Sequence, residues 1–592
     1  MRFRFAVLLW ATALCAQQWK PADNPLTTPW TADVHADRAW PEYPRPQMVR
    51  AQWTNLNGLW DYAIRAKDEP RPERFEGKIL VPFAVQSALS GVKRPLTPDQ
   101  RLWYRRTFGA RLKKGRRLIL HFEAVDWQAE VFVNGKPVGR HEGGYDPFHF
   151  DITDALKPEG DQELAVAVWD PTDTGLEPRG KQVLEPGGIW YTAVSGIWQT
   201  VWLEPVAADH VTELSMTPDL DGKQLRLTVH TERPADFTAT ARLNGRVVGR
   251  LSGTTNAELR LPVREIEPWS PDHPTLYDLR IALKSGDAVD SYFAMRKVEI
   301  RKDAADFNRI FLNNHPLFLI GPLDQGWWPD GLYTAPTDAA LRSDIETLKK
   351  LGYNMCRKHV KVEPARWYYW ADKLGLAVWQ DMPSAMQKGR PAVRARSPND
   401  VQFSADEAAE FQKELTALVH HLANTPSIIA WVPFNEGWGQ HDTNDVLRLV
   451  KKLDPSRLVD GPSGWEDRGY GDMKDMHSYP GPNMFPVMED RASVLGEFGG
   501  LGLPIEDHLW WNKRNWGYRT FEDREKLQEG YTALIEKLEP LVRQGLAAAV
   551  YTQTTDVEGE VNGLMTYDRK VLKYDAAKMA EMHRRLIESV RQ

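Results

Sequence analysis

After about residue 307 the chain alternates short apolar segments with amphipathic helical segments, and this alternation restricts the fold more than any other feature. Short apolar segments joined by helical segments are typical of parallel strands with helical crossovers. The predicted strands cover residues 317–323, 353–359, 376–381, 428–435, 458–460, 473–477, 493–497 and 547–553. Eight strands in about 290 residues predict a (β/α)8 TIM barrel. A doubly wound sheet is the alternative, but no glycine-rich phosphate loop follows the first strand.

Two all-β regions precede the predicted barrel, so the chain is expected to be multidomain. Residues 17–206 contain short strands separated by Gly, Pro and Asp turns, including a hairpin turn at Asn134-Gly135, which predicts an N-terminal jelly-roll β-sandwich. Residues 207–302 contain a second set of strands with closely spaced turns, which predicts an immunoglobulin-like β-sandwich. The C-terminal barrel is then expected over residues 303–592. A chain of 592 residues is also too long for one hydrophobic core.

The first 16 residues have the pattern of a signal peptide. Arg2 and Arg4 precede an apolar stretch that ends in small residues. This stretch is too short to cross a bilayer, and no later segment has the roughly 18 consecutive apolar residues that a membrane helix needs. Removal of the signal leaves Cys356, so neither internal disulfides nor a cysteine-based metal site is expected. The sequence predicts a periplasmic or secreted protein with no membrane span.

Composition excludes some classes of partner. A formal charge of −6 argues against a nucleic-acid-binding protein, which normally presents a basic face. The chain contains 24 tryptophans, and indole rings stack well on the C–H faces of sugars. Large β-sandwiches and barrels also use tryptophan to fill their cores. The tryptophan content is therefore compatible with a carbohydrate-active protein without requiring one.

Polar side chains lie at or just after nearly every predicted barrel strand. Catalytic residues of (β/α)8 barrels project from the C-terminal ends of the strands. An ionisable group at almost every strand end is not needed for packing, so these positions are candidates for a functional site. The candidates are Asp324, Arg357, His359, Asp381, Asn435, Glu436, His477, Tyr479, Glu497 and Tyr551.

Two glutamates are the leading catalytic candidates. Glu436 follows the fourth predicted strand and Glu497 ends the seventh, with glycines beside each that would leave room for a ligand. Strands four and seven lie across the barrel from each other, so the two carboxyl groups can converge on one sugar. A separation of roughly 5–5.5 Å would indicate a retaining glycosidase, and Asn435 could donate a hydrogen bond to the sugar 2-hydroxyl. For either glutamate alone, a structural salt bridge at the barrel top is the alternative.

Four short motifs resemble those of glycoside hydrolase family 2, which contains β-galactosidases, β-glucuronidases and β-mannosidases. The motifs are 195–203 (SGIWQTVWL), 352–359 (GYNMCRKH), 431–436 (WVPFNE) and 495–499 (LGEFG). The resemblance extends over the whole chain after the signal, and it implies the same order of jelly roll, immunoglobulin-like sandwich and barrel. It also implies that Glu436 is the acid/base, that Glu497 is the nucleophile and that Arg357 orients the nucleophile.

The resemblance leaves the charge of the sugar open. The β-glucuronidases hold the uronate with an Asn-x-Lys element, and the similar stretch here has Glu560 and Asn562, which argues against a glucuronide. On the other hand, Lys358, His359 and Lys361 cluster after the second strand and could receive a carboxylate. The alternative for that cluster is a solvated charged rim.

Other candidate contacts follow from the same comparison. The stretch Arg357-Lys358-His359 is one residue shorter than in the family, so the resemblance does not fix the position of His359. Tyr551 stands where the family has a tryptophan at the floor of the sugar site, and a tyrosine there would still stack on the sugar. Asp381, His477 and Tyr479 are expected either to orient the site or to serve structural roles. An aromatic rim at the barrel mouth is expected from Trp327, Trp328, Trp438 and Trp465.

These features predict a retaining exo-β-glycosidase acting on an oligosaccharide or glycoside, with a β-galactoside as the first choice of substrate. A β-uronide or a pentopyranoside is the alternative within the same chemistry. Alternatives of other classes are a catalytically silent carbohydrate-binding protein and a structural scaffold. No cofactor is expected, and no required metal, because the Glu-Tyr-Ala-His stretch of the large β-galactosidases is absent. The oligomeric state is left open.

Overall fold

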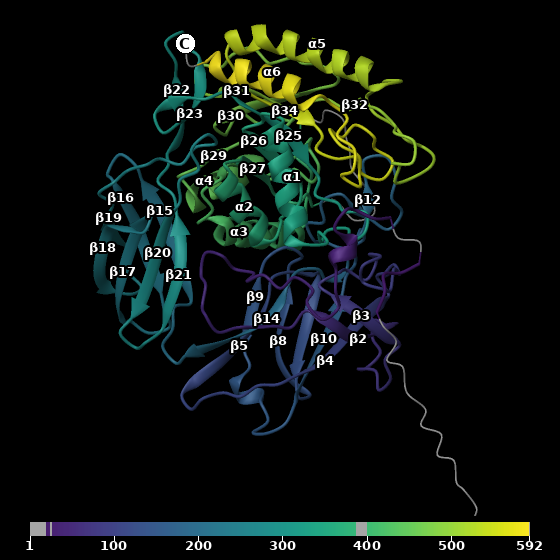
Figure 1. Cartoon of the computed structure of the whole chain (residues 1–592), viewed down its shortest axis with the longest axis vertical. Helices are drawn as coiled ribbons and strands as arrows, with labels where there is room; N and C mark the ends of the chain where they lie inside the picture. Colours follow the sequence, from purple (N-terminus) through teal and green to yellow (C-terminus); the bar gives the residue numbers. More distant parts are fainter. Residues whose placement is uncertain (1–18, 24–25, 386–398, 591–592) are drawn as a thin grey trace, which may run out of the picture.

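In the computed structural model the described residues, 19–23, 26–385 and 399–590, form two β-sandwiches packed against a barrel (Figure 1). The predicted signal peptide at 1–16 lies outside the described residues. No helix in the described part of the chain is both long enough and apolar enough to cross a membrane.

The N-terminal sandwich contains a four-stranded and a six-stranded antiparallel sheet. The first has the order β1 (Thr54–Asn55), β14 (Val201–Ala207), β5 (Arg116–Phe122), β9 (Phe148–Asp151). The second has the order β3 (Gly77–Val81), β2 (Gly58–Ala66), β4 (Gln100–Phe108), β10 (Gln162–Trp169), β7 (Gln128–Val133), β8 (Lys136–Glu142). Asn134 and Gly135 have φ of 52° and 77° and join β7 to β8, as the hairpin prediction requires.

Alternation along these strands builds the core of the sandwich. Val131 and Val133 of β7 pair with Val166 and Leu164 of β10, and all four side chains are fully buried. Since successive side chains of a strand point to opposite faces, this pattern directs one face of the sheet to the core. The jelly-roll prediction is confirmed.

The second sandwich lies beside the jelly roll and the barrel (Figure 1) and contains seven antiparallel strands. One sheet has the order β15 (Glu213–Asp219), β16 (Gln224–His230), β19 (Leu259–Pro262). The other has the order β18 (Arg246–Thr254), β17 (Asp236–Leu243), β20 (Tyr277–Leu283), β21 (Ala288–Phe293). A hairpin of β22 (Val298–Lys302), β23 (Asn308–Leu312) and β24 (His315–Pro316) follows. The strand β23 packs against strands of the barrel.

The barrel strands occupy the predicted segments, which confirms the predicted fold class. Neighbouring strands in chain order pair in parallel, and the eighth strand pairs with the first. An isolated parallel bridge between Asp460 and Met473 links the fifth and sixth strands and closes the ring. The strands are β25 (Leu319–Asp324), β26 (Met355–Lys358), β27 (Ala377–Asp381), β28 (Ile428–Val432), β29 (Leu458–Val459), β30 (Met473–Ser478), β31 (Ala492–Gly499) and β34 (Leu546–Thr552).

Six helices of the described residues cover the outside of the barrel. They are α1 (Asp338–Lys350), α2 (Ala365–Leu374), α3 (Ala405–Leu422), α4 (Thr443–Leu453), α5 (Arg524–Arg543) and α6 (Ala576–Glu588). Capping supports the boundaries: the Thr337 side chain accepts from the backbone of α1, and Ser404 forms a capping box with Glu407 at the start of α3. The crossovers at 460–472 and 479–491, which the structure describes in full, contain no helix.

One segment of the jelly roll extends onto the C-terminal face of the barrel. We call residues 178–192 the docking segment; it contains β11 (Gln182–Val183) and β12 (Tyr191–Thr192). The backbone amides of Arg179 and Gly180 both donate to the carbonyl of Ser384 at 3.1 Å. At its other end, the amide of Thr192 donates to Glu558 at 2.8 Å. The docking segment therefore places jelly-roll side chains beside the ends of the barrel strands.

Candidate active site

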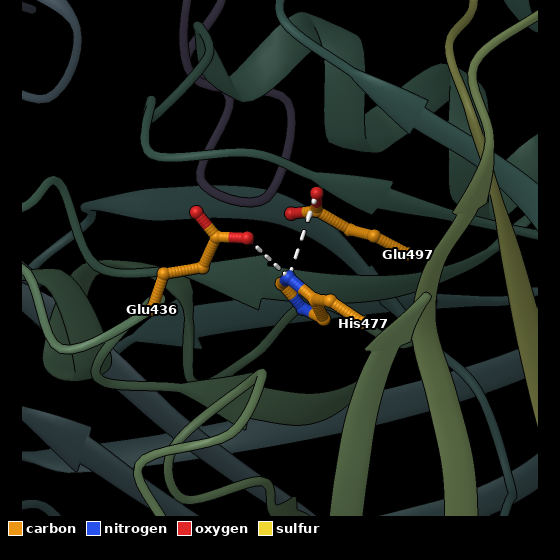
Figure 2. Close-up of side chains that lie close together, drawn as sticks. All are labelled: Glu436, His477 and Glu497. Carbon is orange, nitrogen blue, oxygen red and sulfur yellow. Dashed lines mark hydrogen bonds and ion pairs between the residues drawn. The ribbon is translucent and has the colours of Figure 1, made fainter. Parts of the chain in front are cut away.

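The two glutamates converge on one point at the barrel mouth, with His477 between them (Figure 2). Nδ1 of His477 lies 2.7 Å from Oε1 of Glu436 and 3.5 Å from Oε2 of Glu497. One oxygen of each carboxylate and a His477 ring nitrogen all lie within 4.8 Å of one another. This proximity falls in the range that allows both carboxyl groups to act on one anomeric carbon.

Glu497 is held as a charged group. Its Oε1 accepts from the guanidinium of Arg357 at 3.2 Å, and its Oε2 accepts from the hydroxyl of Tyr479. Burial by itself would raise the pKa of Glu497, but the positive charges of His477 and Arg357 outweigh it and lower the pKa to about 2. Glu497 therefore carries a negative charge throughout the physiological range.

Asp381 fixes the orientation of Arg357. The guanidinium donates to both carboxylate oxygens of Asp381, at 2.9 and 3.0 Å, in a fork geometry. Asp381 also contacts Nδ1 of His359 at 2.7 Å. Burial lowers the pKa of His359 well below 6.5, and the neighbouring cations Lys181 and Arg357 act in the same direction. His359 is therefore a neutral ring held in place by Asp381.

Glu436 has different surroundings. It has a φ of 51°, an uncommon conformation for a residue other than glycine, and its side chain is 12% exposed. His477 supplies its hydrogen-bond contact, and the other ring nitrogen of His477 lies 2.8 Å from the hydroxyl of Ser463. That hydroxyl donates to Asp475 at 2.5 Å. Burial would lower the pKa of His477, but the carboxylates of Glu497 and Glu436 raise it above 6.5.

Asn435 presents a donor beside the pair. Its Oδ1 accepts from Arg357 at 2.7 Å, which directs the amide nitrogen away from the guanidinium. That nitrogen is buried and has no acceptor in the described part of the chain. A sugar hydroxyl bound near the glutamates is a chemically suitable acceptor.

Trp465 also lies beside the pair, since its ring meets the ring of His477 edge-on with centroids 5.6 Å apart. Asp324 lies elsewhere. It accepts from the Lys358 ammonium at 2.7 Å and supports that buried lysine rather than the glutamates.

Tyr551 differs from its prediction. Its hydroxyl lies 2.8 Å from that of Tyr574, and its ring packs edge-on against Phe498 and Tyr531 on the helix-facing side of the sheet. The expectation that this ring forms the floor of a sugar site is therefore wrong. Because side chains alternate along β34, the next residue, Thr552, faces the site and contacts the Tyr479 hydroxyl at 2.7 Å.

The lysines after the second strand also differ from both expectations for them. Lys358 and Lys361 are fully buried, and each donates to Glu363 at 2.9 Å. They form neither a solvated rim nor a receptor for a substrate carboxylate, because the two carboxylates of Glu363 and Asp324 already balance their charges.

The glycines near Glu497 serve packing rather than ligand access. A Cβ on Gly496 would lie 1.9 Å from an oxygen of Asp475, and one on Gly499 would lie 2.3 Å from the Tyr551 ring. The close approach of Asp475 and Tyr551 therefore requires glycine at both positions.

Several site residues were not predicted from the sequence. Asp475 lies two residues before His477 on β30, so strand alternation was an available signal. Tyr518, whose ring stacks on Tyr479 at 3.6 Å between centroids, and Ser463 come from loops without a local pattern. Lys181 comes from the jelly-roll domain, and no local pattern links it to barrel residues that lie far from it in the sequence.

The described residues offer one group able to hold a metal ion by proximity, Glu436, His477 and Glu497. Its nitrogen and one carboxylate already contact each other at hydrogen-bond distance. Two acidic side chains that meet at the strand ends of a (β/α)8 barrel, with a histidine in contact with both, define the class of site used by glycosidases.

Comparison with known proteins identifies the family. Residues 308–480 match the TIM barrel domain of glycosyl hydrolases family 2, residues 209–296 match the model named for glycosyl hydrolases family 2, and residues 92–189 match the galactose-binding domain-like region of glycosyl hydrolase 2. The chain belongs to glycoside hydrolase family 2.

Curated relatives carry two different activities in their names. A β-galactosidase of Thermoanaerobacter pseudethanolicus is 27% identical over 383 residues, which cover 61% of this chain and 48% of that protein. A putative β-glucuronidase of Formosa agariphila is 26% identical over 384 residues, covering 60% and 44%. The chain thus spans about half the length of the curated relatives it matches.

Solved structures share the whole architecture. The β-D-glucuronidase of Dictyoglomus thermophilum superposes with a TM-score of 0.74 at 18% identity, covering 92% of this chain and 98% of that one. At this identity the likeness establishes the fold.

Proposed function

We propose that the protein is a retaining exo-β-glycosidase that releases a terminal β-linked sugar from a glycan or glycoside. The observation that carries the proposal is the short distance between Glu436 and Glu497, whose nearest carboxylate oxygens lie within 4.8 Å of each other. The two carboxyl groups also have different neighbours. Two carboxyl groups this close act as nucleophile and acid/base, whereas inverting enzymes need a wider gap for a water molecule.

In the first step, the Glu497 carboxylate attacks the anomeric carbon while the bond from that carbon to the leaving oxygen breaks. Glu436 gives a proton to the leaving oxygen. In the second step, water attacks the anomeric carbon, Glu436 takes a proton from that water, and the ester bond to Glu497 breaks. The sugar leaves with its original β configuration.

The surrounding residues prepare this chemistry. Arg357 and Tyr479 keep Glu497 ionised and aimed, and Asn435 offers its free amide donor to the sugar 2-hydroxyl. His477 links the two carboxyl groups, so it can supply or receive the proton that Glu436 exchanges. These side chains come from different strand ends, and their mutual contacts preorganise the site before substrate binds.

The test is a panel of 4-nitrophenyl β-glycosides (galactoside, glucoside, mannoside, arabinoside, glucuronide and galacturonide) with the product anomer followed by proton NMR. We expect at least one to be hydrolysed with the β anomer appearing first. First appearance of the α anomer would contradict the retaining mechanism. Binding of a sugar with no turnover of any member would favour a carbohydrate-binding protein.

Among neutral sugars a β-galactoside is the first candidate substrate, and among acidic sugars a β-uronide is the candidate. The curated relatives support both, since their names include β-galactosidases and putative β-glucuronidases. We also propose that the N-terminal segment exports the protein, which is tested by fractionating cells that express the full chain.

A further inference from the structure

The docking segment fixes the backbone at Lys181 on the C-terminal face of the barrel. The Gln182 side chain donates to Asp126 at 2.9 Å and to the Tyr145 hydroxyl at 3.1 Å. The carbonyl of Lys181 itself accepts from the Tyr191 amide at 2.9 Å. These bonds set the backbone position of Lys181 before any ligand binds.

The Lys181 ammonium nevertheless has no polar partner among the described residues. The residue is 4% exposed, yet no carboxylate of the described part of the chain pairs with its Nζ and no oxygen there accepts from it. Its nearest aromatic neighbours are the rings of Tyr191 and Trp438, whose centroids lie 5.4 and 5.8 Å from Nζ. An ammonium in a side chain this enclosed, with no acceptor from the protein, is a suitable binding group for an anionic ligand.

The other buried lysines show how this chain normally treats such a group. Four lysines of the described residues are buried, namely Lys181, Lys358, Lys361 and Lys573. Lys358 and Lys361 each donate to Glu363 at 2.9 Å, and Lys573 donates to Asp556 at 2.7 Å. Lys181 is the exception among these four, and both catalytic glutamates act on its charge.

The charges around Lys181 indicate which side of the site it serves. Burial lowers the pKa of Lys181, whereas the carboxylates of Glu560, Glu497 and Glu436 act in the opposite direction, in that order of strength. The ring of Trp438, whose centroid lies 5.8 Å from Nζ, also lies 6.2 Å from the ring of His359. Asp381 holds His359 beside Arg357, so the ammonium lies on the side of the site where Arg357 holds the nucleophile. Arg357 cannot serve there, because its guanidinium already donates to Asp381, Asn435 and Glu497.

We propose that Lys181, supplied by the jelly-roll domain, binds the carboxylate of a uronic acid residue held at the glutamate pair. The inference rests on the proposed glycosidase function and assigns its substrate to the acidic sugars. It departs from the expectation drawn from Glu560 and Asn562, because the Glu560 carboxylate already accepts from Asn562 at 3.0 Å and from the Tyr191 hydroxyl. A carboxylate gives the ammonium the oxygen acceptor that it lacks together with an opposite charge at hydrogen-bond distance, whereas a hydroxyl gives the acceptor alone.

The test compares acidic and neutral substrates with the same aglycone. We would measure kcat/KM for 4-nitrophenyl β-glucuronide, galacturonide, glucoside and galactoside with the wild-type protein, Lys181→Met and Lys181→Gln. Loss of one charge-assisted hydrogen bond corresponds to roughly 10- to 100-fold. We expect that loss for a uronide and a change of less than about threefold for the matching neutral glycoside. Lys114→Met, which alters an exposed lysine of the jelly roll, is the control.

Two results would overturn the assignment. One is hydrolysis of a neutral glycoside with no uronide hydrolysed by the wild-type protein. The other is an equal loss on uronide and neutral glycoside in both Lys181 variants, with melting temperatures unchanged. Either result leaves the glycosidase function intact. Both proposals would be rejected if the wild-type protein hydrolysed none of the four substrates and if free glucuronate and galacturonate did not raise its melting temperature.

Discussion

The surroundings of Glu497 and Glu436 differ although the two side chains meet at one point. Glu497 is enclosed by Arg357, Tyr479 and His477, and these contacts keep it ionised. Glu436 is more exposed and has its contact with His477, which bears a proton more readily than a free histidine. The site therefore keeps a negative charge on Glu497, as a nucleophile requires, and places Glu436 beside a histidine with which it can exchange a proton, as an acid/base requires.

The largest expected effect comes from Glu497→Gln. The amide cannot form the covalent bond to the sugar, so we expect kcat to fall by about 10⁴-fold or more for every substrate. Steady-state kinetics on the best substrate of the panel measures the loss. Mass spectrometry after reaction with a 2-deoxy-2-fluoro glycoside should locate the trapped sugar on Glu497, and a label on Glu436 would reverse the assigned roles.

A smaller and selective effect is expected from Glu436→Gln. General acid catalysis contributes about 10²- to 10⁴-fold, and its share depends on how poor the leaving group is. We therefore expect a severe loss for an alkyl or sugar leaving group and a milder loss for 2,4-dinitrophenol. Equal losses across leaving groups would show that Glu436 does not protonate the departing oxygen.

Tyr479→Phe tests how much the hydrogen bond from Tyr479 contributes to the reactivity of Glu497. The variant removes one hydrogen bond to a charged carboxylate, and we expect kcat/KM to fall roughly 10- to 100-fold with little change in the melting temperature. Tyr369→Phe, whose hydroxyl contacts the exposed Lys373 on α2, is the matched control. An unchanged rate in Tyr479→Phe would mean that Arg357 and His477 suffice to hold the nucleophile.

Local sequence patterns were sufficient to predict the barrel and the meeting of its two glutamates. Each apolar strand and each polar strand end is encoded within a few residues, and barrel closure then brings Glu436 and Glu497 together. The direction of Tyr551 was missed because it depends on the parity of β34, where Ala548 and Val550 face the barrel interior and Tyr551 faces the helices.

Contacts between the domains could not be predicted from local sequence patterns. Lys181 reaches the site because the docking segment pairs with residues near Ser384 and Glu558, about 200 and 370 positions away in the chain. No spacing or periodicity links such residues. By contrast, Glu363 follows Lys358 and Lys361 closely, so the neutralisation of those lysines was open to prediction from the sequence.

The smallest predicted effect is on the pH dependence of the melting temperature, and it tests whether His477 carries the proton beside Glu436. Because the pKa of His477 is raised above 6.5 in the folded protein, its contribution to stability is complete below that value and is lost as the pH rises through the folded pKa. The depressed pKa of Glu497 acts at acidic pH, since its contribution to stability is lost only as the pH falls toward about 2.

In His477→Gln the melting temperature should therefore decline less between pH 6 and pH 9 than in the wild-type protein, by on the order of 1 °C. His420→Gln, which changes an exposed histidine of α3, should follow the wild-type curve. Parallel curves for the wild-type protein and His477→Gln would mean that the proton does not reside on His477, and the contrast between the two glutamates would then have to come from Arg357 and Tyr479 alone.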